Sequence, residues 1–441
     1  MTRPPATPAR SPLPPVTLSE AEQRLLVRLL ELPTAGPLEV EGDHPVELWQ
    51  AQREYASAAA ELGFEVVHHA PADETEVSGE HVPATVRDAL AQIPDFLAKQ
   101  PNLVLRLGPP RPRAATVMFN VHLDTVAGTD PVVFDGIRFH GRGAIDAKGP
   151  AVALLAGVRA AREAVPALGE EIAVLIQAVS GEEGGAMGVF GTRPLIQRGH
   201  VGRLNVFCEP TGRRVLTRST AAMTARLRVA GHDAIDDDPG AGHNATVLLG
   251  FLAQHLATEL PPHARDGQVC IAGLHTGTMH NKVYGTGELL LNLSYGSVAG
   301  AQRLAEALDR AVRTGLDEFA SRFADTELFR LTAMQAADIV ELDWLKRGLP
   351  ALTGADPWAE DLIRDAGLSR WPEKQSAFTC DAIWMNGVPD ATTVVFGPGD
   401  LGANNAHADG EYADLAELNA FAHDVARILE SFSHHQLRDG T

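Results

Sequence analysis

The stretch NVHLD at residues 120–124 is followed closely by GRGAIDAKG at residues 141–149, and these two segments decide the fold. The residues before the first stretch, TVMF at 116–119, form the continuous run that a fully buried strand requires. His122 and Asp124 therefore follow a buried strand, at the end of an open α/β sheet where ligands bind. A His-x-Asp pattern suits a metal site because a ligating imidazole needs a second group to fix its tautomer.

The second stretch places Asp146 just before a predicted helix over residues 151–164. Its glycines allow the backbone to come close to an ion. Together, the two segments predict a metal site at the carboxyl edge of the sheet.

Two further predicted strands end in carboxylates. Residues 172–179 lead into SGEEGG, which contains Glu182 and Glu183, and the short run VFC at 206–208 leads into Glu209. Adjacent carboxylates repel each other when they are buried. A metal relieves that repulsion for one of the pair and leaves the other free as a general base.

A fourth predicted strand, at residues 392–396, runs through a glycine-rich turn to His407. A lone histidine is usually a satisfied or exposed residue. Here it follows a strand of the same sheet. The candidate ligands named so far are one histidine and several carboxylates, so a second nitrogen ligand is still missing.

Composition excludes several classes of function. The chain has 441 residues, of which 45% are apolar, and this length favours two or more domains. Its net charge of −20 disfavours nucleic acid or an anionic membrane as partner. Its three cysteines have no paired spacing and indicate reduced thiols in a cytoplasmic protein. The first sixteen residues contain six prolines and no apolar segment, which predicts a disordered tail rather than a signal peptide.

The N-terminal part is predicted to contain helices over residues 17–30 and 46–62 and strands over 63–67 and 103–107. Residues 71–101 suggest no chemistry, and we interpret them as a surface insertion with a helix over 82–98.

These ordered motifs resemble the acetylornithine deacetylase, succinyl-diaminopimelate desuccinylase, aminoacylase and carboxypeptidase G family of dizinc amidohydrolases. The resemblance extends from about residue 20 to the C-terminus and leaves out the insertion. It implies a mixed-sheet α/β zinc-peptidase catalytic domain with an inserted α+β, ferredoxin-like domain that serves as lid and dimer interface. The expected division is a tail at 1–16, a catalytic domain at 17–212 and 334–441, and a lid at 213–333.

The resemblance also implies a role for each site residue. Two Zn²⁺ ions per chain, with Co²⁺ or Mn²⁺ as substitutes, would share Asp146. Asp124 would orient His122, and Glu182 would be the general base. The expected metal ligands are His122, Asp146, Glu183, Glu209 and His407. Three carboxylate ligands against two Zn²⁺ leave one positive charge, which a bridging hydroxide would cancel.

The predicted lid departs from the family pattern at two positions. Counting back from Pro239, the usual lid histidine is replaced by Ile235, and thirteen residues after the matching Asn281 the usual carboxylate-binding arginine is replaced by Ser294. An isoleucine cannot donate a hydrogen bond to an oxyanion, and a serine cannot reproduce the bidentate fork of arginine. A different alignment is also open, since His232, His275 and His280 lie nearby.

The lid contains an acidic run, Asp233 and Asp236–Asp238, with two interpretations. It either receives a cationic or amine-bearing substrate or is a solvated loop. The first functional hypothesis is zinc-dependent hydrolysis of an N-acyl or peptide-like amide bond by a homodimeric enzyme. The alternatives are a dizinc enzyme that forms or cyclises an amide in biosynthesis, and a non-catalytic relative that binds a ligand. The presence of Glu182 argues against the last, because a binding protein needs no general base.

Overall fold

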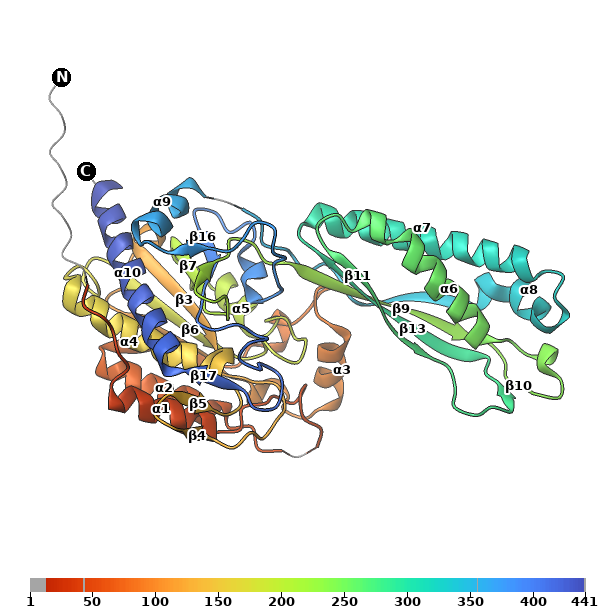
Figure 1. Cartoon of the computed structure of the whole chain (residues 1–441), viewed down its shortest axis with the longest axis horizontal. Coiled ribbons are helices and arrows are strands. Elements are labelled where there is room, and N and C mark those ends of the chain that lie inside the picture. Colours follow the sequence, from red (N-terminus) through yellow and green to blue (C-terminus); the bar gives the residue numbers. More distant parts are fainter. Residues whose placement is uncertain (1–12, 43, 355, 440–441) are drawn as a thin grey trace, which may run out of the picture.

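The computed structural model describes residues 13–42, 44–354 and 356–439. It has two lobes joined by a narrow connection (Figure 1). The larger lobe is built from the N-terminal and C-terminal parts of the chain, and the middle of the chain forms the smaller lobe. No helix in these ranges is long and apolar enough to cross a membrane.

The larger lobe is organised around a mixed six-stranded sheet with strand order β1-β2-β6-β3-β7-β16. The last four strands in this order run parallel, and β1 and β2 are antiparallel to their neighbours. Every residue of those four parallel strands is buried, which explains their continuous apolar sequences. The bounds are β1 Phe64–Ala70, β2 Asn102–Leu107, β3 Thr116–His122, β6 Ala173–Val179, β7 Leu204–Phe207 and β16 Thr392–Val395.

Helices cover both faces of this sheet. Alternate residues of β3 point to opposite faces, so that Phe119 joins the core under the long helices while Met118 joins a smaller core beside α5. Ser19 caps α1 and completes a capping box with Glu22. The helices are α1 Glu20–Glu31, α2 Leu48–Glu61, α4 Gly149–Ala164, α5 Thr192–Gln197, α9 Pro357–Asp365 and α10 Leu415–Asp439.

Two small sheets complete the larger lobe. One contains β4, β5 and β17, and the other pairs β8 with β15. Their bounds are β4 Val133–Phe134, β5 Arg138–His140, β8 Arg214–Val215, β15 Ser369–Arg370 and β17 Tyr412–Asp414.

The smaller lobe is an antiparallel four-stranded sheet with the order β11-β13-β9-β14 and three helices packed on it. This arrangement confirms the predicted fold class, a mixed-sheet α/β domain with an α+β insertion. The elements are β9 Ala221–Ala230, β10 Ala234–Ile235, α6 Ala245–Glu259, β11 Gln268–His275, β12 Lys282–Val283, β13 Thr286–Tyr295, α7 Val298–Phe323, α8 Arg330–Ile339 and β14 Val340–Lys346.

The limits of the smaller lobe differ from the predicted 213–333. Its sheet begins at Ala221, and β8 belongs to the larger lobe, where it pairs with β15. Its last strand, β14, lies beyond residue 333 and pairs with β9. The sequence of β14, VELDWLK, alternates apolar and charged residues over 340–344, so a strand pattern was present there that the expected boundary at residue 333 left out of the lobe.

The predicted tail and insertion also need correction. Residues 1–12 lie outside the described residues, but Val16, assigned to the tail, is buried in the core. The insertion helix α3 spans Ala84–Gln92 and is shorter than predicted, because the residue before Pro94 disfavours the helical conformation. The insertion packs against Ala186 and Phe190 of the larger lobe in a separate apolar cluster.

Candidate metal centre

Four parallel strand ends bring the predicted site residues together. His122 ends β3, Glu183 follows β6, Glu209 follows β7, and His407 lies in the loop after β16. Asp146 comes from the loop before α4. The clustered donor atoms form three groups. Two of them share Asp146, with His122 and Glu209 in one and Glu183 and His407 in the other, and the third joins His122 with Glu182 and Glu183.

Asp146 lies between the two histidines. Its Oδ1 is 2.9 Å from Nε2 of His122, and its Oδ2 is 3.1 Å from Nε2 of His407. Nε2 of His407 is also 2.9 Å from Oε1 of Glu183. A carboxylate whose two oxygens face different nitrogen donors has the geometry needed to bridge two cations.

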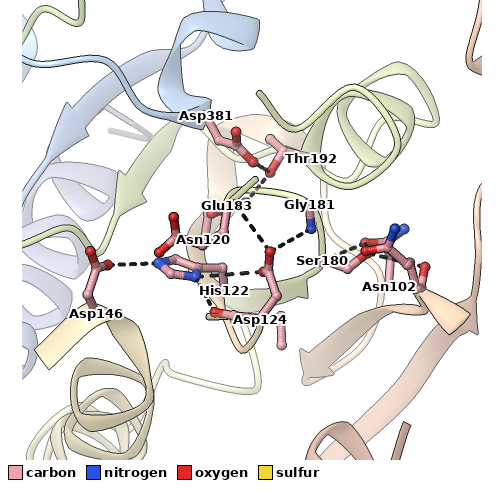
Figure 2. A network of polar contacts seen from close by, with 12 residues as sticks. Asn102, Asn120, His122, Asp124, Asp146, Ser180, Gly181, Glu183, Thr192 and Asp381 are labelled. Carbon is pink, nitrogen blue, oxygen red and sulfur yellow. Dashed lines mark hydrogen bonds and ion pairs between the residues drawn. The ribbon is translucent and has the colours of Figure 1, made fainter. Parts of the chain in front are cut away.

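His122 is oriented by Asp124, but through the backbone (Figure 2). Its Nδ1 lies 2.9 Å from the carbonyl oxygen of Asp124, which can only accept, so Nδ1 donates and Nε2 faces Asp146. The Asp124 carboxylate is 3.7 Å from the ring and instead accepts from the backbone N–H groups of Gly181 and Glu183, at 2.9 and 3.2 Å. Asp124 thereby fixes the loop after β6 as well as the imidazole.

The charges of the site fit bound cations. Burial raises the pKa of Glu183 to about 7 and that of Glu209 to about 8. Glu182 keeps some exposure to solvent, but most of its surroundings are protein. This burial, and then the negative charge of Glu209, raise the pKa of Glu182 well above its usual value. So many carboxylates in one buried cluster are costly without positive charge, and divalent metal ions supply it.

Glu411 supports the Asp146 loop and was not identified from the sequence. Its carboxylate accepts from the backbone N–H groups of Gly143 and Ile145 at 3.0 Å and from Nη1 of Arg142 at 2.8 Å. Gly143 has a φ of +82°, and a side chain there would meet Thr125. A glutamate four residues after the predicted ligand His407 was the only sequence signal.

Asp381 is a second residue that the sequence analysis missed. It is fully buried beside the centre, and its Oδ2 accepts from the hydroxyl of Thr192 at 2.6 Å (Figure 2). Its other oxygen has no hydrogen-bond partner. The segment TCDA around it lies between predicted elements and contains no recognised spacing, so nothing in the sequence marked it.

The three lid residues lie outside these clusters and are not brought together. Ile235, on β10, is 61% exposed and pairs with Lys282, the neighbour of the exposed Asn281. Ser294 lies near the opposite end of the lobe, in the last part of β13, where its Oγ accepts from the backbone N–H of Gln268. Ile235 and Asn281 are thus near the tip of the smaller lobe, and Ser294 is near the connection.

Ser294 lines a cavity of about 590 Å³ at the connection of the two lobes. Three cationic side chains, Arg218, Arg265 and Lys374, also line it. Arg218 donates to the backbone carbonyls of Glu373 and Gln375. These cations come from separate segments of the chain, so no local pattern in the sequence places them near Ser294.

Several other charged residues of the smaller lobe are paired. Asp233, first of the acidic run, forms an ion pair with Lys282 and accepts from the backbone N–H of Gly285. On β9, Arg226 pairs with Glu288 and Arg228 with Glu341. Neither arginine is therefore available as a free carboxylate-binding group.

Comparison with known proteins identifies the family. The model of peptidase family M20/M25/M40 matches residues 118–431. A protein of Aeropyrum pernix provisionally named a LysW-lysine/LysW-ornithine hydrolase is 29% identical over 175 residues, which are 40% of this chain and 46% of that protein. The chain thus spans about half the length of this curated relative.

Solved structures share the fold. The aminopeptidase PepT from Bacillus cereus has a TM-score of 0.64 and 17% identity, covering 93% of this chain and 98% of that one. The M20 family metallo-carboxypeptidase Sso-CP2 from Sulfolobus solfataricus has a TM-score of 0.66 and 11% identity, covering 94% and 100%. Since the family model matches most of this chain, the chain belongs to peptidase family M20/M25/M40.

Proposed function

We propose that this hydrolase cleaves an amide bond, N-acyl or peptide-like, in a small substrate with Glu182 as general base. The observation that supports this most directly is the division of the carboxylates. Asp146, Glu183 and Glu209 belong to the two groups that share Asp146, whereas Glu182 belongs only to the third group, with His122 and Glu183. A carboxylate beside a metal centre but outside its ligand set is free to accept a proton.

The two groups around Asp146 would hold two divalent cations, with Asp146 shared between them. Two imidazoles and three carboxylates suit Zn²⁺, and Co²⁺ or Mn²⁺ could replace it. When bound, such cations supply Lewis acidity toward the scissile carbonyl and toward a water molecule.

The chain's own residues would handle the proton. Glu182 would take it from the attacking water and return it to the leaving amine. Its raised pKa, caused by burial and then by Glu209, brings its affinity for a proton closer to what this transfer requires near neutral pH. His122 and Asp124 would hold the neighbouring donors in place.

We further propose that the amine released on hydrolysis is basic, as in a diamine or a basic amino acid. One finding supports this: the relative from Aeropyrum pernix is named for lysine and ornithine derivatives. Hydrolysis of an amide to release a basic amine would be chemistry of the acetylornithine deacetylase type.

We propose that the smaller lobe acts as a lid and as the interface of a homodimer. The edge strand β11 of this lobe is largely exposed. Leu274 on this strand is 41% exposed, and Met279 in the segment after it is 58% exposed. Exposed strand edges and apolar patches are typical of surfaces that pair with another chain.

A substrate panel tests the proposed function. Chelator-stripped protein reconstituted with zinc is incubated with dipeptides, N-acyl amino acids and amides of diamines, and released amine is measured. We expect turnover that requires zinc and is highest for amides of basic amines. The Glu182→Gln protein, equally loaded with zinc, is the matched control. Absence of zinc-dependent turnover across the panel would reject the proposal.

A further inference from the structure

We propose that Asp381 is a positioning residue that holds the loop of Glu182 and Glu183 in its working geometry. The role of Glu182 rests on the proposed function, whereas the placement of Glu183 can be tested without turnover. Asp381 belongs to none of the groups of clustered metal-type donors in the described residues, so it acts through the loop and not as a ligand.

Two buried carboxylates contact opposite ends of this loop, residues 181–192. Asp124 accepts from the backbone N–H groups of Gly181 and Glu183 at the start. The loop then closes on itself, because the N–H of Gly188 donates to the carbonyl of Gly181 at 2.8 Å. At its far end, Asp381 accepts from Thr192.

Gly188 is the contact point between Asp381 and the closed loop. It has a φ of +62°, and a Cβ added there would collide with the carboxylate of Asp381. The Asp381 carboxylate therefore lies directly against the residue that closes the loop. A shift of this carboxylate would move Gly188 and with it the hydrogen bond to Gly181, the neighbour of Glu182.

The direction of the hydrogen bonds keeps Asp381 as an acceptor. Nδ2 of Asn120 donates to Oγ1 of Thr192 at 3.1 Å, which leaves the hydroxyl hydrogen of Thr192 for Asp381. Asn120 precedes His122 on β3, so this chain of bonds ties Asp381 to the strand of a predicted ligand. No lysine, arginine or histidine among the described residues forms an ion pair with Asp381 to compete for it.

On its other side, Asp381 is attached to the connection between the lobes. The backbone N–H of Cys380 donates to Oγ of Ser219 at 3.1 Å, and the N–H of Thr220 donates to the carbonyl of Phe378 at 3.1 Å. Ser219 and Thr220 lead directly into β9 of the smaller lobe. Asp381 thus links the start of the smaller lobe to the loop that contains Glu182 and Glu183.

The test compares Asp381→Asn and Thr192→Val with wild type. The first keeps the shape and removes the charge, and the second removes the donor while leaving Asp381 in place. Glu22→Gln is the matched control, since Glu22 pairs with Arg159 away from the centre. Three quantities are measured: zinc affinity by chelator competition, amide hydrogen exchange of residues 181–192, and kcat and KM on the best panel substrate.

Both test variants should still bind two zinc equivalents at saturation. We expect about 10- to 100-fold weaker zinc affinity at one of the two sites, faster exchange of the loop amides, and kcat lowered about 10- to 100-fold with KM changed less than about threefold. Glu22→Gln should match wild type in all three. If Asp381→Asn does not fold, Thr192→Val alone decides.

Other outcomes would overturn the proposal. Unchanged zinc affinity and loop exchange would show that Asp381 does not position the loop, and a rise in KM alone would indicate a substrate contact. Equal effects in Glu22→Gln would indicate general destabilisation. If wild type shows no turnover on the panel, the proposed function fails, but zinc affinity and loop exchange still decide the role of Asp381.

Discussion

Glu182 and Glu183 are neighbours in sequence with different surroundings. Glu183 contacts His407, a partner of Asp146, whereas Glu182 is partly exposed and outside the groups that share Asp146. The carboxylate oxygens of both residues lie within 4.8 Å of each other and of His122, but only Glu183 also reaches the group of Asp146 and His407.

This difference predicts opposite effects of two substitutions. Glu182→Gln should retain both metals and lose kcat by at least about 100-fold, since general acid–base transfer contributes about 10²- to 10⁴-fold. Glu183→Ala should lower metal content. Metal analysis together with steady-state kinetics checks both. Near wild-type activity of Glu182→Gln would contradict its assignment as the base.

A second residue-scale prediction concerns Ser294 and Ile235. Without arginine and histidine at these positions, we expect less than a tenfold preference, about 1.4 kcal/mol, for a substrate with a free α-carboxylate over its carboxamide. The measurement is kcat/KM for a matched pair that differs only in this group. A larger preference for the acid would reveal a carboxylate-binding group, for which Arg218, Arg265 and Lys374 beside Ser294 are the candidates.

At the scale of elements, the loop between β5 and α4 depends on a partner far along the chain. Glu411 satisfies three backbone N–H groups of this loop and pairs with the buried Arg142. The loop could not hold Asp146 in place by glycines alone, because glycine adds conformational freedom.

Glu411→Ala should therefore destabilise the fold. The substitution leaves Arg142 with Asp130 as its remaining carboxylate partner, at 3.3 Å, and removes three backbone hydrogen bonds. Breaking a buried pair costs about 3 to 5 kcal/mol. Chemical denaturation of the metal-free protein measures the loss, with Glu22→Gln as a comparison away from the metal centre. A loss under about 1 kcal/mol would contradict the supporting role of Glu411.

Elements differed in how far the sequence predicted them. The parallel strands β3, β6 and β7 were recognised because their buried apolar runs end in metal-type residues, and both signals are local. Thr192 and Asp381 lie 189 residues apart, so no local spacing reveals their contact. The edge strand β14 has a recognisable alternation of apolar and charged residues, but its pairing with β9 joins distant segments and has no local signal.

At the scale of the whole molecule, the fold gathers negative charge in the larger lobe and depends on cations to balance it. In the metal-free protein, burial raises the pKa of Glu183 to about 7 and that of Glu209 to about 8, from an ordinary 4.5. Raised pKa values mean that the stability contribution of these groups is complete below about pH 4.5 and is lost as the pH rises through 7 to 8.

Zinc should therefore stabilise the protein more at higher pH. Ligation requires ionised carboxylates and a neutral His407, whose pKa the hydrogen bonds of Asp146 and then Glu183 raise to about 10. Metal uptake then releases protons, and the rise in Tm caused by zinc should be larger near pH 8 than near pH 5.5. Calorimetry with and without zinc checks this, and a smaller rise at the higher pH would contradict it.

Metal analysis of the Asp146→Ala protein tests the shared metal centre most directly. Chelator-stripped wild-type protein reconstituted with zinc should approach two equivalents per chain. The Asp146→Ala protein should lose both together, because the two groups of donors proposed to hold the cations share this carboxylate. Retention of two equivalents by the variant, or clean loss of only one, would contradict a centre in which both cations depend on Asp146.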